Sequence, residues 1–259
     1  MKTQRSTRKS RKERDSQPVT PVLPEEVWIL AGQSNMIGYG PVGAQLPAEW
    51  RVPPPNVSIY WVGAWRELVP GDGGFGPEVG FGHEMAKAFP ERRILLIKPD
   101  FGLGSIYVDW RSPNAGRGPA GPHYLALLPL VREALASHSA AKLVGTLWMQ
   151  GEGDAHNDLV KAESYERNLT LFIESLRQDL NAPAMDFVFG KISESPIWVY
   201  ADKVREAQSR VQAAMPRTAV FETIDLPFCG DDMHYSTMGA IELGRRFARA
   251  AIGLRNADE

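Results

Sequence analysis

The segment Val27-Trp28-Ile29-Leu30-Ala31-Gly32-Gln33-Ser34-Asn35-Met36 joins an apolar run to a short polar turn. The run from Val27 to Ala31 is continuous, which is typical of a strand covered on both faces of a sheet. It ends at Gly32, and the turn that follows carries Ser34. A serine in this place usually caps a helix or lines a phosphate loop, but beside a base it can act as a nucleophile.

Outward from this segment, strand-like and helix-like runs alternate along the chain. The alternation predicts one α/β/α sandwich on a parallel sheet. Pro129 lies inside one predicted helix, where we expect a kink or a later start. Further strands are predicted at 57–62, 93–98, 143–149, 187–190 and 219–224, and helices at 78–89, 124–136, 160–180, 203–215 and 237–252.

Polar side chains follow four of the predicted strands. In parallel sheets ligands bind beyond the carboxyl ends of the strands, so Ser34, the loop 101–105, Gln150 and the loop 231–234 are expected at one edge. In the last loop Asp231 precedes His234 by three residues. That spacing lets the carboxylate accept from Nδ1 while Nε2 faces a cleft. The structural alternative is a loop in which Asp231 caps backbone amides.

Two further segments offer groups that could stabilise a developing oxyanion. Gln150 carries a side-chain amide, and Gly102 and Gly104 present backbone amides with no side chain in the way. A buried glutamine that ties loops together and an ordinary glycine-rich turn are the structural alternatives. No His-Glu-x-x-His or comparable zinc spacing appears, so we expect neither a metal nor a cofactor. A divalent metal site remains the alternative, because one group of acidic and histidine side chains offers possible ligands. That group is Asp231, Asp232, His234, Glu152, Asp154 and His156.

Bulk properties exclude several classes of protein. Residues 1–16 hold seven Lys or Arg against Glu13 and Asp15, a balance of +5, so the remainder carries −7 to reach the net −2. Because the positive charge lies in residues 1–16 and the rest of the chain is acidic, nucleic-acid binding by the folded domain is not expected. We expect residues 1–23 to be a disordered basic tail and 24–259 a single domain. The single cysteine, Cys229, excludes an internal disulfide, and a nucleophilic role for it is the weaker alternative.

Two kinds of segment bear on where the protein is located, a secretion signal and a membrane span. No apolar stretch follows the basic tail as a secretion signal requires, and none approaches the roughly 20 apolar residues of a membrane span. Without such segments the sequence indicates a soluble, cytoplasmic protein.

Together the blocks resemble the SGNH-type hydrolases, and more narrowly the sialate O-acetylesterase-related branch that includes carbohydrate esterase family six acetylxylan esterases. The resemblance covers nearly all of the chain outside the tail. It departs from the family at Leu103, where a second glycine is usual, and at Gly153, where a serine is common. The matching residues are Gly32-Gln33-Ser34-Asn35-Met36, Gly76-Pro77-Glu78, the loop from Gly102 to Trp110, Trp148-x-Gln150-Gly151-Glu152-x-Asp154-Ala155, and Asp231-x-x-His234-Tyr235.

What the resemblance implies is a five-stranded, flavodoxin-like sheet and a serine esterase that removes acetyl groups from carbohydrates. By family pattern Ser34 is the nucleophile, His234 the base and Asp231 its orienting acceptor. The oxyanion donors are then the amides of Ser34 and Gly102, with Gly104 as second choice for the glycine, and the side chain of Gln150. Related enzymes are often exported, so the resemblance does not settle the location.

Two other functions remain as alternatives, a general SGNH lipase or thioesterase and a catalytically silent sugar-binding module. The expected partner is an acetylated polysaccharide, oligosaccharide or sialic acid, while the oligomeric state is not indicated. Exposed tryptophans near the site would suit stacking against sugar rings, and Trp61, Trp65 and Trp110 lie in predicted loops near the edge. A histidine base predicts activity that rises from about pH 5 to 8.

Overall fold

The computed structural model describes residues 23–256. Its single sheet has seven strands in the order β3-β2-β4-β1-β5-β6-β7. The predicted tail, residues 1–23, lies outside the described residues except for Leu23, and its disorder stays a prediction. The strands are β1 (Glu25–Gly32), β2 (Val57–Trp61), β3 (Ala64–Glu67), β4 (Arg93–Ile97), β5 (Lys142–Met149), β6 (Asp186–Gly190) and β7 (Thr218–Phe221).

The expected five-stranded sheet is wrong in number, although its five-strand core is present. Taken alone, β4-β1-β5-β6-β7 follows the flavodoxin-like order 2-1-3-4-5 in chain order. The sheet is wider because β2 pairs in parallel with β4, and β3 pairs antiparallel with β2 at the edge. Ala64 to Glu67 buries none of its residues, so it lacks the apolar pattern by which a strand is recognised from sequence.

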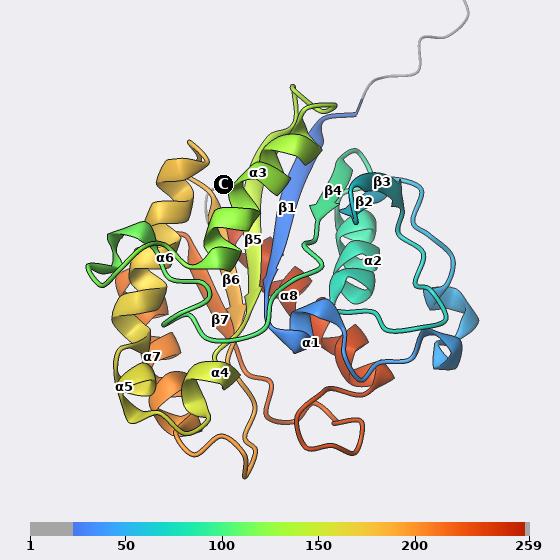
Figure 1. Cartoon of the computed structure of the whole chain (residues 1–259). Coiled ribbons are helices and arrows are strands. Elements are labelled where there is room, and N and C mark those ends of the chain that lie inside the picture. Colours follow the sequence, from blue (N-terminus) through green and yellow to red (C-terminus); the bar gives the residue numbers. More distant parts are fainter. Residues whose placement is uncertain (1–22, 257–259) are drawn as a thin grey trace, which may run out of the picture.

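Helices cover both faces of the sheet (Figure 1). On one face α2 and α8 pack against each other, and their glycines Gly80 and Gly244 bring the two backbones into contact. The other face carries α3, α6 and α7. The helices are α1 (Ser34–Ile37), α2 (Glu78–Ala88), α3 (Pro122–Leu135), α4 (Glu152–Ala155), α5 (Leu159–Glu163), α6 (Tyr165–Asp179), α7 (Ala201–Ala214) and α8 (Thr237–Asn256), with short 3-10 turns at Gly43–Gln45, Ala48–Trp50 and Pro113–Ala115.

Two predicted helices differ from those observed. α3 begins at Pro122 and runs through Pro129, so a later start is wrong; the first helical position tolerates proline because its N–H would be unpaired there. The single helix expected over 160–180 is two helices, α5 and α6, that meet at Ser164. The Ser164 hydroxyl donates to the carbonyl of Val160, which offers the backbone an alternative to the helical bond.

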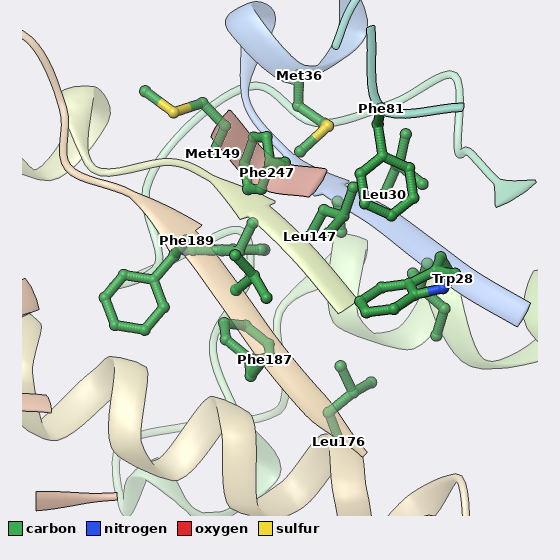
Figure 2. Packing of buried hydrophobic residues seen from close by; sticks show 14 of the residues in the cluster. Trp28, Leu30, Met36, Phe81, Leu147, Met149, Leu176, Phe187, Phe189 and Phe247 are labelled. Carbon is green, nitrogen blue, oxygen red and sulfur yellow. The ribbon is translucent and has the colours of Figure 1, made fainter. Parts of the chain in front are cut away.

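The core lies between the sheet and the two helix layers (Figure 2). Trp28 of β1 packs edge to face on Phe81 of α2, with ring centroids 5.3 Å apart. Figure 2 also shows Met36, which points from α1 into the cluster that holds Phe81 and Phe247. Because α1 has one turn and little stability of its own, this buried side chain is part of what fixes it to the domain.

The carboxyl end of β1 is the point where the strand order reverses. β1 lies between β4 and β5 and is parallel to both. The chain leaves β1 toward the β2–β4 side and later crosses to β5 on the other side. Such a switch point is where open α/β sheets bind ligands, and Ser34 stands two residues beyond β1. Within the described range, residues 23–256, no helix is long and apolar enough to cross a membrane.

Candidate active site

The turn that carries Ser34 is held by close backbone contacts. Gly32 has φ +151°, and a Cβ there would lie 2.0 Å from the carbonyl oxygen of Met149, so a side chain at this position would not fit. The amide of Gln33 donates to the same carbonyl at 2.7 Å. α1 then begins at Ser34 and closes on Gly38, whose amide donates to the Ser34 carbonyl at 2.8 Å. Ser34 is thus half-buried at the head of a fixed turn.

The far end of α1 rests on a buried ion pair. Lys98 Nζ donates to the carbonyl of Ile37 at 2.8 Å and to Oε2 of Glu78 at 2.7 Å. Glu78 Oε1 in turn accepts from the amide of Gly76. Burial lowers the pKa of Lys98, and the nearby carboxylate of Glu78 opposes that shift. The turn that carries Ser34 is therefore supported by a charged pair that is buried away from water.

Asp231 and His234 form the expected pair. The distance from His234 Nδ1 to Asp231 Oδ2 is 2.5 Å, and Asp231 Oδ1 accepts from the amides of Met233 and His234 at 3.0 and 2.8 Å. Partial burial would raise the pKa of Asp231, but the bonds from His234 and Met233 outweigh it and hold that pKa well below its usual range. Asp231 therefore caps the loop and also orients the imidazole.

Asn35 joins the turn that carries Ser34 to the loop that carries His234. Its Nδ2 donates to the carbonyl of Met233 at 3.1 Å, and its Oδ1 accepts from the amide of Tyr235 at 3.1 Å. The two bonds bracket His234, so the residue after Ser34 is fixed to both neighbours of the imidazole. Asn35 Nδ2 also reaches Oε1 of Glu152, a buried group whose pKa is raised by desolvation against the bond from Asn35.

The hydroxyl of Ser34 forms no hydrogen bond with His234 in the part of the chain that the structure describes. The backbone amides of Ser34 and Gly102 also donate to no acceptor within residues 23–256. Gly102 has φ +152° and lies against the carbonyl of Gly32, where a Cβ would approach to 2.3 Å. Gly104 instead faces the carboxylate of Asp109. Gly102 therefore packs against the backbone that leads into the turn of Ser34, while Gly104 packs against Asp109.

Gln150 is fully buried at the end of β5, and its amide is engaged. Nε2 donates to Oδ2 of Asp154 at 2.6 Å and approaches the carbonyl of Gly104 at 3.4 Å. The hydroxyl of Tyr165 lies 3.1 Å from Oε1. Desolvation raises the pKa of Asp154 to about 7, although Gln150 and the amides of Ile106 and Tyr107 donate to it. Tying loops together is therefore a role that Gln150 has here.

Several residues weighed from the sequence lie apart from this arrangement. Trp110 is fully buried among Trp148 and Phe172, so it offers no face to a sugar, contrary to expectation. Trp65 packs on His138, which bonds Glu25 at the start of β1, so it lies at the opposite end of the sheet. For residues 23–256, no three His, Cys, Asp or Glu side chains are grouped so that they could hold a metal ion.

Sequence reasoning assigned no role to Gln33, Asn35 or Tyr39. Gln33 Oε1 accepts from the amides of Gly151 and Gly153, both at 3.1 Å, and so connects the nucleophile turn to the block that holds Gln150. The imidazole of His234 lies against the ring of Tyr39. Gln33 and Asn35 flank Ser34 in the sequence, and these two amide side chains beside a serine were the feature from which their roles could have been predicted.

Comparison with known proteins identifies the family of the chain. The family model for carbohydrate esterase, sialic acid-specific acetylesterase, matches residues 24–253. The chain belongs to this family. A probable carbohydrate esterase of Arabidopsis thaliana, At4g34215, is 30% identical over 258 residues, which cover 90% of this chain and 92% of the relative. The X-ray structure of the same Arabidopsis protein superposes with a TM-score of 0.75 at 25% identity, over 89% of this chain and 98% of that one.

Two more distant structures share the fold. NanS has a TM-score of 0.66 at 15% identity, over 92% of this chain and 100% of that one. XAC1771, a carbohydrate acetylesterase from Xanthomonas citri, has a TM-score of 0.64 at 19% identity, over 89% of this chain and 56% of that one. Membership in the family indicates an esterase that acts on carbohydrates, while the narrower resemblance to family six acetylxylan esterases is not confirmed.

Proposed function

We propose that the protein hydrolyses O-acetyl esters of carbohydrates, with Ser34 as nucleophile, His234 as base and Asp231 as its orienting acceptor. The observation that carries the proposal is the 2.5 Å contact between Asp231 Oδ2 and His234 Nδ1 in a loop that Asn35 attaches to the nucleophile turn. An oriented imidazole and a serine on a fixed turn are the parts that a serine hydrolase needs.

The reaction proceeds in two halves. Ser34 Oγ attacks the acetyl carbonyl while His234 Nε2 takes its proton, and Asp231 stabilises the imidazolium that forms. The tetrahedral intermediate then collapses, the ester bond breaks, and the sugar alkoxide leaves with the proton from His234. Water, deprotonated by His234, next attacks the acetyl-serine, the bond from Ser34 Oγ to the acetyl carbon breaks, and acetate leaves while Ser34 Oγ takes the proton back from His234. The missing Ser34–His234 hydrogen bond is compatible with this, because such bonds often tighten only when substrate is bound.

The oxyanion needs donors that are free to point at it. The amides of Ser34 and Gly102 have no acceptor among residues 23–256, so both can serve. Gln150 is the third expected donor, but its side chain is fully buried and its second N–H approaches the carbonyl of Gly104 at 3.4 Å, so it serves only if substrate binding uncovers that N–H. The 2.6 Å bond to Asp154 would then hold the amide of Gln150 in place while its other N–H donates to the oxyanion.

The test is acetate release from acetylated xylo-oligosaccharides, O-acetyl N-acetylneuraminic acid and acetylated hexosides, with the Ser34→Ala variant alongside. We expect release from at least one of them, and a loss of at least about 10³-fold in kcat for Ser34→Ala, since the nucleophile acts as part of a unit. Ser209→Ala, at another half-buried serine, on α7, is the matched control and should behave like the parent protein.

Other outcomes would replace the proposal. Unchanged turnover in Ser34→Ala, or no turnover of any acetyl ester, would indicate a sugar-binding module without catalysis. A strong preference for long-chain over acetyl p-nitrophenyl esters would indicate a lipase or thioesterase. The same panel distinguishes oligosaccharides, simple hexosides and sialic acid as substrates, and acetylated xylan added to it tests the polysaccharide.

A further inference from the structure

Tyr39 stands beside the candidate catalytic histidine with its ring open to solvent. Its ring centroid is 5.9 Å from that of His234, and the two planes are inclined at 72°. The side chain of Tyr39 is 47% exposed. Of the large exposed hydrophobic side chains in residues 23–256, it is the one with an aromatic ring. An exposed ring beside a candidate catalytic side chain is a surface that a ligand can cover.

The backbone fixes Tyr39 in this place. Its amide donates to the carbonyl of Ser34 at 3.1 Å. The next residue, Gly40, has φ +98°, and a Cβ there would lie 2.7 Å from Cβ of His234. The chain therefore passes tightly between the nucleophile turn and the histidine loop. Tyr39 also stays outside the packed apolar core, so core packing does not account for its ring.

The proposed reaction determines which part of a substrate lies near Tyr39. The leaving alkoxide receives its proton from His234 Nε2, so the alcohol half of the ester must lie beside the imidazole. The carbonyl oxygen must instead lie at the amides of Ser34 and Gly102. The exposed ring of Tyr39 thus belongs to the side of the site that receives the alcohol, not the acetyl group.

We infer that Tyr39 is the platform on which the sugar ring of the leaving alcohol stacks. This rests on the proposed function and deepens it. A pyranose presents a face of C–H bonds with a small positive charge, which suits the negative face of an aromatic ring. Tyr39 is then a specificity-determining residue that favours esters of cyclic sugars over esters of small alcohols with the same acetyl group.

The experiment compares two esters that differ in the alcohol alone. For Tyr39→Ala we expect KM for the best acetylated sugar of the panel to rise about tenfold, with kcat little changed, as loss of one aromatic contact predicts. The kcat/KM for ethyl acetate, whose alcohol has no ring, should stay that of the parent protein. Tyr39→Phe keeps the ring and should behave like the parent on both esters.

Two results would overturn the inference. Equal losses of Tyr39→Ala on the sugar ester and on ethyl acetate would mean that Tyr39 acts through His234 rather than on the sugar. An unchanged KM for the sugar ester would mean that nothing stacks there. Tyr39→Leu, which keeps apolar bulk without a flat face, replaces the alanine variant if that one fails to fold, and Leu125→Ala, an exposed residue of α3, is the surface control.

Failure of the proposed function is a separate result. If Ser34→Ala keeps the activity of the parent, the nucleophile is wrong whatever Tyr39 does. If Ser34→Ala is inactive and the Tyr39 variants match the parent on both esters, the proposed function stands and the platform does not.

Discussion

The imidazole of His234 is held by three residues that have different tasks. Asp231 fixes Nδ1, and Asn35 binds the backbone on both sides of the ring. Glu152 lies behind Asn35 as a buried carboxyl group, and desolvation raises its pKa although the bond from Asn35 opposes that shift. One of these residues, Asp231, follows from its three-residue spacing to His234, which sequence alone shows. The task of Asn35 does not, because its partners are backbone groups about 200 positions away.

The pH dependence of the reaction should come from the imidazole rather than from Asp231. The pKa of Asp231 is depressed, so this carboxyl group stays ionised across the working range. A histidine acts as base only when it is neutral, and we expect kcat/KM for the acetyl ester to rise from about pH 5 to 8. Initial rates measured in buffers of constant ionic strength check this. A flat profile over that interval would argue against His234 as the base.

At the scale of elements, α1 places Ser34, but its four residues give little indication of a helix in the sequence. Four residues cannot form a stable helix by themselves. α1 is held by Met36 in the core, by the cap at Gly38 and by Lys98 at the carbonyl of Ile37. The local sequence pattern predicts strand β1 and the polar turn after it. It does not predict that the ammonium group of Lys98 supports α1, because Lys98 resembles an ordinary polar residue at the end of a strand.

Removing the charge beneath α1 should cost the protein much of its stability. In Lys98→Met the carboxylate of Glu78 is left buried without its cation, and the carbonyl of Ile37 loses its donor. Breaking such a pair from one side typically costs about 3–5 kcal/mol in the free energy of unfolding. Urea denaturation of the two proteins measures the difference.

The double variant Lys98→Met with Glu78→Gln is the matched control, since it leaves no unpaired charge. We expect it to be more stable than Lys98→Met alone. A single variant within about 1 kcal/mol of the parent would show that the pair does not support the turn.

At the scale of the whole molecule, one edge of the sheet gathers segments from all along the chain. The order of strands and helices predicted that edge and the flavodoxin-like core, since parallel strands put their carboxyl ends together. It did not predict the number of strands, because β3 has no buried face. Nor did it show that Gln150 and Asp154 are sealed beneath the loop 104–107, as burial is a property of the assembled fold.

The sealed carboxyl group of Asp154 should make the stability of the molecule depend on pH. Its pKa is about 7 in the folded protein, against an ordinary value of 3.8. Between these values the folded state keeps a proton that the unfolded state has lost. The contribution is therefore full below about pH 4 and is lost as pH rises through 7.

Asp154→Asn removes that proton and leaves the other titrating groups in place. The free energy of unfolding of the parent protein minus that of the variant should fall by on the order of 4 kcal/mol between pH 4 and pH 8. Urea denaturation of both proteins at four pH values across this range measures it. A difference that stays constant with pH would mean that Asp154 is ionised in the folded protein throughout, because the amides of Ile106 and Tyr107 and the side chain of Gln150 then outweigh its desolvation.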